Sequence, residues 1–438
     1  MRDTLARTLY LCYFGLREPL VQTQVLPYLR ELVAGGIEVF LLTFEPQLAA
    51  RWKADELETT RARLAGEGIR WHYLPYHKQP TVPATAYDIA QGARLAARLV
   101  RQYDIQVLHA RAHIPLAMAL IAQRARASCR LVFDIRGLMA EEYADAGIWT
   151  PSSAQFRAVK RLERAGIRRA DQIVVLTERM RDWLVEHKLK RASEIEVIPC
   201  CVDFSRFDEE AATGEATGEA AEEASGEARE ETAAAGERFE VVYAGSVTGL
   251  YLLEEMGRFF LKIRERRARA FLRIMTQSSS EEAAARLISV GLQRDDFSVG
   301  AVAPSEVPAG LRRARLGLSF RKPTFSQLAA SPTKVPEYLA AGLPVVCNAG
   351  IGDTDDLLNR ERVGVIIESF DEESLSEAAD KALALTLEPL MGERARRAAR
   401  VHFDLSKVGG TRYRNLYRRL EEQGGIRGAI AKIPFKAR

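Results

Sequence analysis

Lys334 and Glu337 stand three positions apart in the segment SPTKVPEYLAAGLPVV, at the expected start of a short helix. Thr333 can cap that helix, and Pro336 fits its first turn, where the N–H that proline lacks has no partner. A helix N-terminus with a lysine favours an anion such as phosphate, whereas an ionised carboxylate can only accept hydrogen bonds, for example from the hydroxyls of a ribose. The pair therefore predicts a pocket for a nucleotide diphosphate with a sugar attached. An ordinary surface Lys–Glu pair is the alternative interpretation.

A second group of candidates follows two apolar strands in the first half of the chain. His109 and Arg111 lie at the end of one strand, and Asp134, Arg136 and Glu141 follow the next. For Arg136 we favour a functional role, because an arginine clustered with acids is costly unless it is used or paired. The alternatives are a structural ion pair between Asp134 and Arg136 and a half-buried structural role for His109.

The elements that must position these residues alternate between strand and helix. This alternation is typical of a parallel, doubly wound α/β sheet, whose ligands bind beyond the carboxyl ends of the strands. The chain has 438 residues, which is too long for one core, and the alternation restarts after residue 238. The expected strands are residues 8–14, 37–44, 69–73, 107–110, 130–135, 172–176, 194–198, 239–244, 271–275, 297–299, 316–320, 345–347 and 363–367. The expected helices include residues 21–34, 84–101, 115–126, 156–169, 250–267, 372–385, 388–402 and 404–423.

An acidic tract separates the two halves. Residues 209–237 contain ten Glu and one Arg, whereas the whole chain has a formal net charge of +4. The rest of the chain is therefore strongly basic, which suits an anionic ligand, an anionic membrane surface or nucleic acid. No nucleic-acid recognition motif accompanies the charge, so we expect no nucleic-acid partner.

These features define the expected domain organisation. The chain consists of an N-terminal α/β domain (1–207), a low-complexity acidic linker or insertion (208–238), a second α/β domain (239–403), a C-terminal helix (404–424) and a basic tail (425–438). The tail interleaves apolar and basic residues and could touch an anionic membrane, but we favour a frayed terminus.

Several protein classes are not expected. The five cysteines form no C-x-x-C pair, so neither a disulfide framework nor a zinc site is indicated. The N-terminus has too short an apolar run for a signal peptide, and no run approaches the length of a membrane span. We expect a cytoplasmic protein, with the inner face of the membrane as a second possible location.

Five segments of the chain resemble a known family. The segment SPTKVPEYLAAGLPVV, followed by NAGIGD, resembles the donor-site segment of retaining glycosyltransferases of family 4, which have the GT-B fold. VIPCCVDFSRF resembles the segment between their two domains, and VVYAGSVTGLYLLEEM resembles the opening of the second. FDIRGLMAEEYADAGIW and VQTQVLPYLRELVAGGIEVFLLTFE resemble a bacterial branch that makes cell-surface polysaccharides.

This resemblance implies a fold, an activity and a set of site residues. It implies two Rossmann-like domains facing a central cleft, transfer of a sugar with retention from a nucleotide-diphosphate-sugar donor to a carbohydrate or lipid-linked acceptor, and no cofactor beyond that co-substrate. The implied donor-binding residues are Gly245, Ser246, Tyr251, Arg321, Lys322, Ser331, Thr333, Lys334 and Glu337. The implied acceptor-side residues are Arg17, His109, Arg111, Asp134 and Glu141, and the implied catalytic residues are Arg136, Lys334 and Glu337. The last helix, 404–423, is expected to cross back to the first domain.

The sequence departs from the family pattern at two points. Many members have two glutamates eight positions apart, but the position eight before Glu337 is Ala329. Many also have an Arg and a Lys in the loop equivalent to residues 246–251, which here contains neither. Lys334 would then neutralise the diphosphate together with Arg321, Lys322 or Arg136.

Two further expectations concern metal and alternative activities. Asp353-Thr354-Asp355 resembles a D-x-D metal motif of another glycosyltransferase fold, but its place after a Gly-x-Gly turn favours helix capping, so we expect no metal. A nucleotide-sugar epimerase on the same fold and a non-catalytic nucleotide-sugar-binding or scaffold protein are the alternatives to a transferase.

Overall fold

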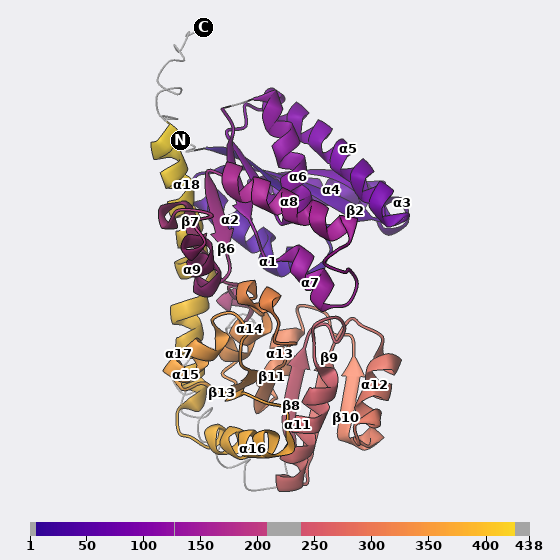
Figure 1. Ribbon diagram of the computed structural model, residues 1–438. Helices are drawn as coiled ribbons and strands as arrows, with labels where there is room; N and C mark the ends of the chain where they lie inside the picture. The colour runs from indigo at the N-terminus through magenta and orange to yellow at the C-terminus, as the bar shows by residue number, and fades with distance from the viewer. Residues whose placement is uncertain (1–5, 127, 208–237, 425–438) are drawn as a thin grey trace, which may run out of the picture. The chain divides into compact units, whose positions relative to one another are not determined.

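The computed structural model describes residues 6–126, 128–207 and 238–424, which form two compact units. The N-terminal unit comprises the described parts of Met1–Cys201, Leu328–Ala330 and Leu405–Arg438, and the C-terminal unit those of Val202–Gln327 and Ser331–Asp404 (Figure 1). The expected acidic tract and the basic tail lie outside the described residues, except for Arg238.

The N-terminal unit is built on a seven-stranded parallel sheet in the order β3-β2-β1-β4-β5-β6-β7. The central strands are buried on both faces, which explains their continuous apolar runs. They are β1 (Arg7–Leu11), β2 (Glu38–Pro46), β3 (Ile69–Tyr76), β4 (Val107–Arg111), β5 (Arg130–Asp134), β6 (Gln172–Val175) and β7 (Ile195–Val197).

Helices cover both faces of this sheet. One face packs against α5 (Thr81–Gln102), α6 (His113–Ala122), α8 (Ala154–Arg169) and α9 (Glu178–Glu186), and the other against α1 (Pro19–Gln24), α2 (Leu26–Ala34), α4 (Ala54–Gly66) and α18 (Thr411–Gly424). The shorter elements of the unit are α3 (Leu48–Arg51), α7 (Met139–Asp145), η1 (Gln123–Ala125), η2 (Ala192–Glu194) and the π-helical turn η7 (Leu405–Gly410).

The C-terminal unit repeats the plan with a six-stranded parallel sheet in the order β10-β9-β8-β11-β12-β13. Its strands are β8 (Phe239–Ala244), β9 (Ala270–Met275), β10 (Phe297–Gly300), β11 (Leu316–Ser319), β12 (Val345–Asn348) and β13 (Gly364–Ile367). Its helices are η3 (Phe204–Arg206), α11 (Leu253–Arg266), α12 (Ser280–Ser289), η5 (Arg294–Asp296), α13 (Val307–Arg312), η6 (Phe325–Ala329, whose last two residues pack in the N-terminal unit), α14 (Lys334–Ala340), α15 (Thr354–Glu361), α16 (Glu372–Thr386) and α17 (Met391–Phe403). The expectation of doubly wound parallel sheets is confirmed.

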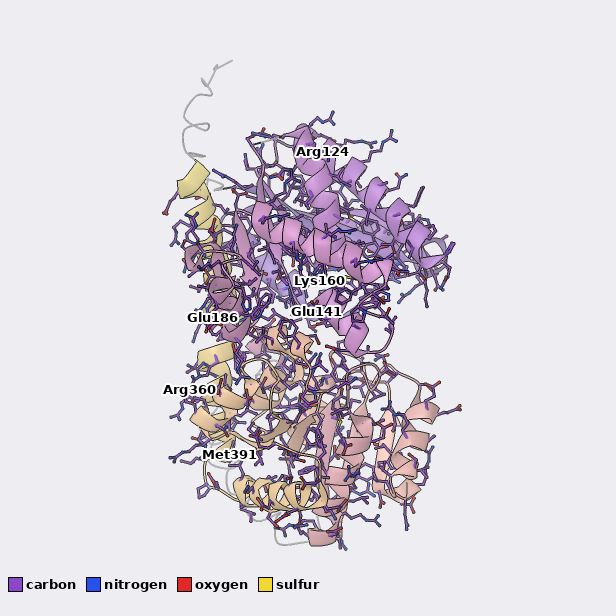
Figure 2. The ribbon with its side chains drawn as sticks, in the orientation of Figure 1. Arg124, Glu141, Lys160, Glu186, Arg360 and Met391 are labelled. Carbon is purple, nitrogen blue, oxygen red and sulfur yellow. The ribbon has the colours of Figure 1, made fainter. Side chains whose placement is uncertain are left out.

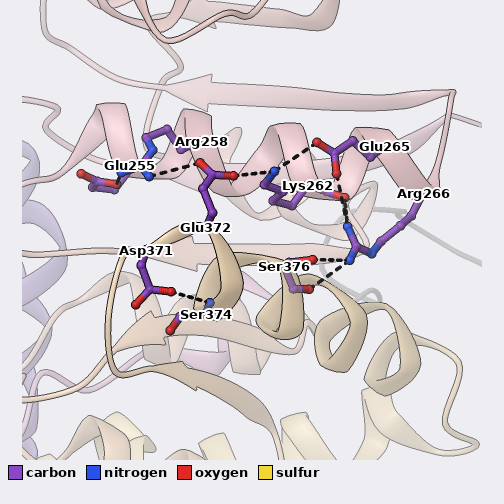
Figure 3. Close-up of polar contacts among 9 residues, drawn as sticks. All are labelled: Glu255, Arg258, Lys262, Glu265, Arg266, Asp371, Glu372, Ser374 and Ser376. Carbon is purple, nitrogen blue, oxygen red and sulfur yellow. Dashed lines mark hydrogen bonds and ion pairs between the residues drawn. The ribbon is translucent and has the colours of Figure 1, made fainter.

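Helices α11 and α16 are joined by a ladder of ion pairs on the surface of the C-terminal unit. Glu372 of α16 contacts Arg258 at 3.3 Å and Lys262 at 2.6 Å on α11 (Figure 3). One turn further on, Arg266 donates to the side chain of Ser376 at 2.7 Å. Basic side chains of α11 therefore lie opposite acceptors of α16.

The expected helix over residues 21–34 is wrong, because the chain forms two helices there. It breaks at Val25 (φ −124°, ψ −65°), and Pro27 lies in the first turn of α2. Proline has no N–H to donate to the preceding turn, and its ring clashes with the carbonyl four residues earlier. Pro27 therefore favours a new helix start over continuation.

The expected helix over residues 404–423 is also interrupted. It begins with η7, and α18 starts only at Thr411. A Cβ on Gly409 would lie 2.6 Å from Cε1 of Tyr28, and one on Gly410 would collide with Glu31. The two glycines therefore allow this turn to lie against α2.

The helix and strand around Lys334 form as expected. Thr333 is the N-cap of α14, although its side chain makes no capping hydrogen bond, and the helix has only seven residues. Gly342 (φ +80°) follows its end, and β12 comes next. No helix among the described residues combines the length and apolarity that crossing a membrane requires.

Candidate functional site

The C-terminal unit gathers several of the expected donor residues at the point where its strand order reverses. The chain leaves β8 toward β9 on one side, while β11 lies on the other side of β8. Loops on the two sides of such a switch point diverge and leave a crevice at the carboxyl ends of the strands. Gly245 and Ser246 follow β8, Arg321 follows β11, and Tyr251 pairs with Arg321 in a short antiparallel bridge.

Lys334 lies at the centre of this group. It is only 3% exposed, and its Nζ is 4.2 Å from the ring centroid of Tyr251 and 4.9 Å from that of Tyr243. Burial lowers the pKa of Lys334. Stacking on aromatic rings favours its charged form and offsets part of that cost.

Gly245 allows the lysine to approach the β8 loop. Its φ is +142°, and a Cβ there would lie 3.1 Å from Cε and 3.2 Å from Nζ of Lys334. A side chain at this position would be strained and would displace the ammonium group. The glycine therefore keeps the backbone of the loop and the charge of Lys334 in close contact.

Arg321 adds a second cation that is held in place. Its guanidinium donates to Oη of Tyr251 at 3.1 Å and to Oε1 of Gln327 at 2.6 Å, and its backbone N–H donates to Oδ1 of Asn348 at 2.8 Å. Gln327 is fully buried, and Asn348 is 2% exposed. Arg321 and Lys334 therefore flank the ring of Tyr251 beside the glycine loop, which is an arrangement suited to an anionic group.

Glu337 lies one turn along α14 and pairs with a residue that was not predicted. Arg206 contacts Oε1 of Glu337 at 3.1 Å and donates to the carbonyl of Pro304 at 2.9 Å. Burial raises the pKa of Glu337, and the charge of Arg206 opposes that rise. The signal for Arg206 was its place in VIPCCVDFSRF, one of the segments that resemble the family.

The other expected donor residues are less deeply placed. Lys322 is exposed, and its backbone N–H donates to the carbonyl of Leu250 at 2.8 Å. Ser331 and Thr333 are partly exposed and immediately precede α14. Their roles stay predictions.

In the N-terminal unit, Asp134 is the centre of a buried polar cluster. Its Oδ2 accepts from Tyr413 at 3.0 Å and lies 3.6 Å from the guanidinium of Arg111, and its Oδ1 lies 3.7 Å from that of Arg136. His109 is fully buried and shares a hydrogen bond with Tyr417 at 3.0 Å. Both tyrosines belong to α18, which thus covers the carboxyl ends of β4 and β5.

The charges in this cluster are set by burial and by the neighbouring cations. Burial alone would raise the pKa of Asp134, but Arg136, His109 and Arg111 together hold it below its usual range. Burial lowers the pKa of His109, so its imidazole is neutral at neutral pH. Arg136 has φ +45° and contacts Sγ of Cys200 at 3.4 Å, with its side chain 10% exposed.

Two of the expected acceptor-side residues have partners of their own. Arg17 lies over the ring of Trp52 at 3.7 Å and pairs with Glu56 at 2.9 Å. Glu141 of α7 accepts from Lys160 of α8 at 2.6 Å, and the two side chains lie next to each other in Figure 2. Their proposed roles in acceptor binding stay predictions.

The described residues contain no group of three or more His, Cys, Asp or Glu that could hold a metal ion. In the D-x-D segment, Asp355 accepts a hydrogen bond from the backbone N–H of Gly350 at 3.1 Å, and α15 begins at Thr354. Asp355 thus stabilises the glycine turn. The expected metal independence remains a prediction.

Part of the N-terminal unit is similar to a known protein family. Residues 21–206 match the model of Glycosyltransferase Family 4. Over these residues, nearly all of which lie in the N-terminal unit, the chain is similar to this family. The match supports the expected affiliation with family 4, whereas the cell-surface polysaccharide branch stays a prediction. No curated protein matches the chain.

Solved structures share the fold of this chain at low identity. A glycosyltransferase from Rickettsia africae is 14% identical with a TM-score of 0.62, over 99% of this chain and 100% of that one. The sucrose-phosphate synthase of Thermosynechococcus elongatus is 14% identical with a TM-score of 0.67, over 95% and 100%. HepE of Anabaena in complex with UDP-glucose is 13% identical with a TM-score of 0.59, over 95% and 99%. These similarities establish the GT-B fold of the chain.

Proposed function

We propose that the protein is a glycosyltransferase that moves a sugar, with retention, from a nucleotide-diphosphate-sugar donor to a carbohydrate or lipid-linked acceptor in cell-surface polysaccharide or glycolipid synthesis. The observation that carries this proposal is the site at the β8–β11 switch point, where Lys334 and Arg321 lie beside a glycine loop. The family 4 match of residues 21–206 and the UDP-glucose complex of a structural relative support the same substrate class. The resemblance also supports a cytoplasmic location.

In this proposal, Lys334 and Arg321 bind the donor diphosphate, which lies over the Gly245–Ser246 loop. Negative charge develops on the diphosphate as the bond to the sugar breaks. Cations held in place before the reaction stabilise that charge without reorganisation. This arrangement would replace the Arg and Lys that residues 246–251 lack.

Glu337 is proposed to accept hydrogen bonds from the ribose hydroxyls. Its pairing with Arg206 keeps the carboxylate ionised and oriented when no donor is bound. Arg206 would then be a positioning residue, since it contacts Glu337 and the carbonyl of Pro304.

The N-terminal unit is proposed to bind the acceptor. Asp134, His109 and Arg111 are at most 4% exposed, so we assign them a positioning role rather than contact with substrate. They hold the loop that carries Arg136, which is the more exposed residue of the cluster. Arg17 and Glu141 remain the proposed acceptor contacts.

The test is incubation of the full chain with a panel of nucleotide-diphosphate sugars in the absence of acceptor. Slow release of nucleoside diphosphate, abolished by Lys334→Met, is the expected result for a transferase. A changed sugar on an intact nucleotide would instead indicate an epimerase. Binding without turnover, also after addition of lipid-linked and oligosaccharide acceptors, would indicate the non-catalytic alternative.

A further inference from the structure

One helix layer of the N-terminal unit carries unpaired arginines. Helix α5 exposes Arg94, Arg98 and Arg101, and α8 exposes Arg157, Arg161 and Arg164. Both sets follow the spacing i, i+4, i+7, which places the three side chains on one side of a helix. Both helices pack their opposite sides on the same face of the sheet, with α6 between them (Figure 1). We call these six residues the arginine face.

No exposed carboxylate balances this charge. The only acidic residues of α5, α6, η1 and α8 are Asp88 and Glu163. Asp88 is 1% exposed and accepts from Tyr13 and His77, and Glu163 is 3% exposed and pairs with His113 and Lys160. None of the six arginines has an ion-pair partner among the residues that the structure describes.

Two other helix surfaces of the described chain pair most of their charges internally. On the opposite face of the same sheet, Arg30 and Arg63 both pair with Glu67, at 2.9 and 2.6 Å. In the C-terminal unit, the basic residues of α11 alternate with carboxylates in the ladder of Figure 3. The arginine face differs from both, and its like charges at i and i+4 repel one another. An external anion would relieve this repulsion.

Apolar and aromatic side chains accompany the arginines. Tyr87 is 53% exposed and lies seven positions before Arg94, on the same side of α5. Ile121, which is 45% exposed, lies in the last turn of α6, the helix between the two arginine rows. Tyrosine and isoleucine beside arginine are typical of a surface that enters the headgroup region of a bilayer.

We propose that the arginine face docks on a bilayer surface that contains anionic lipids. Helix α5 has 22 residues, so at 1.5 Å per residue it offers a contact of roughly 33 Å in length. Guanidinium groups bind phosphate oxygens in bidentate fashion, which suits lipid phosphates spread over a plane. This contact would hold the protein where a lipid-linked acceptor is located. It uses none of the residues of the donor site, so it can be tested independently of the proposed function.

The test is cosedimentation of the full chain with vesicles of phosphatidylcholine alone or mixed equally with phosphatidylglycerol. The variant Arg157→Gln, Arg161→Gln, Arg164→Gln removes the α8 row. Each arginine near an anionic surface contributes about fivefold, so the three substitutions should weaken binding to the mixed vesicles about a hundredfold. Unchanged thermal unfolding of the variant would show that it folds.

The matched control removes the same charge from the C-terminal unit, where Arg267, Arg313 and Arg397 are exposed. Their triple change to Gln should leave vesicle binding at the level of the unaltered protein. The acidic tract is kept in every variant, so that any competition between this tract and the vesicles for the arginines is the same in all of them.

Four results would overturn the proposal. These are no preference for the anionic vesicles, an equal loss in the control variant, loss of binding only on truncation after residue 424, and displacement from vesicles by single-stranded DNA at equal phosphate concentration. The third would assign the contact to the basic tail, and the fourth would assign the face to a polyanionic chain.

Discussion

At the residue scale, Glu337 is a largely buried carboxylate that forms an ion pair with an arginine. It lies beside Arg206 in the C-terminal unit, and its side chain is 19% exposed. Hydrogen bonds to charged groups are worth about 1.5–3 kcal/mol. If Glu337 binds the ribose, its contribution to donor affinity is therefore large enough to measure.

The substitution Glu337→Gln should weaken donor binding about tenfold to a hundredfold, because it removes a charged acceptor while keeping the shape of the side chain. Calorimetric titration with the preferred nucleotide sugar measures this change. Glu368→Gln is the matched control, since Glu368 is exposed, and it should bind as tightly as the unaltered protein. Equal affinities for all three proteins would remove Glu337 from the donor site.

As the pH is lowered, donor affinity should also fall, and it should do so at a higher pH than that at which a free glutamate is protonated. Burial raises the pKa of Glu337, so its carboxylate takes up a proton at a higher pH than a free glutamate does. The protonated group loses its pairing with Arg206 and becomes a weaker acceptor. The free energy of unfolding should change in the opposite direction to donor affinity. The folded state binds this proton more readily than the unfolded chain, so the fold gains stability as the pH falls. In Glu337→Gln this pH dependence of affinity should be absent; a profile identical to that of the unaltered protein would contradict the assignment.

The sequence predicted which charged residues gather near Lys334 better than how they pair. Arg321 was a candidate, and the structure places its guanidinium on Tyr251 beside Lys334. The pairing of Arg206 with Glu337 could not be predicted, because the two residues are 131 positions apart and meet only through the packing of η3 near α14.

At the element scale, α18 completes the N-terminal unit although the C-terminal unit precedes it in the sequence. Tyr413 and Tyr417 are buried, and their hydroxyls reach Asp134, His109 and Thr8 at 2.7–3.0 Å. The helix therefore supplies hydrogen-bond partners to polar groups buried in the N-terminal unit.

Changing Tyr413 to Phe should lower the free energy of unfolding by about 1–3 kcal/mol, because Oδ2 of Asp134 loses its only close hydroxyl donor while buried. Urea unfolding measures the loss. Tyr87→Phe removes a hydroxyl from an exposed ring and should change stability by much less. A loss no larger than that of Tyr87→Phe would show that the hydroxyl of Tyr413 contributes no net stability.

The same cluster should make the N-terminal unit sensitive to acid. The pKa of His109 is lowered from an ordinary value near 6.5 by burial, so below that pH the unfolded chain takes up a proton that the folded state does not. The pKa of Asp134 is also lowered, so its contribution is present above the ordinary aspartate pKa and is lost as the pH falls further. The free energy of unfolding, measured from neutral pH downward, should fall first in the pH range set by His109 and again in the range set by Asp134. The substitution His109→Gln should remove the first of these two declines. A decline unchanged in that variant would assign it to another group.

The elements show where sequence patterns are informative. Strands buried on both faces, such as β2, were predicted from continuous apolar runs. The break between α1 and α2 was visible in Pro27 but was outweighed by the helical spacing of its neighbours. The π-helical turn before α18 depends on the fit of Gly409 against Tyr28, and that contact has no signal in local sequence.

At the scale of the whole molecule, the two described units are built on sheets with closely related strand orders. Residues 209–237, which lie outside the described residues, contain no large apolar side chain. They can add little to either core, because core stability comes from buried apolar area.

Deletion of residues 209–237 should therefore leave thermal unfolding cooperative, with midpoints close to those of the full chain. Differential scanning calorimetry compares the two proteins. A broad transition without a cooperative peak in the shortened chain would show that the tract is needed for folding.

The central claim is that Lys334 binds the diphosphate of a nucleotide sugar at the β8–β11 switch point. The most direct test is calorimetric titration of the full chain with nucleoside diphosphates and their sugars, repeated with Lys334→Met and with Lys78→Met, which removes the same charge from an exposed position. We predict that one nucleotide sugar binds the unaltered protein and Lys78→Met equally, and that Lys334→Met binds it at least about tenfold more weakly. Binding of that ligand with equal affinity to Lys334→Met, or no binding of any nucleotide sugar to the unaltered protein, would contradict the claim.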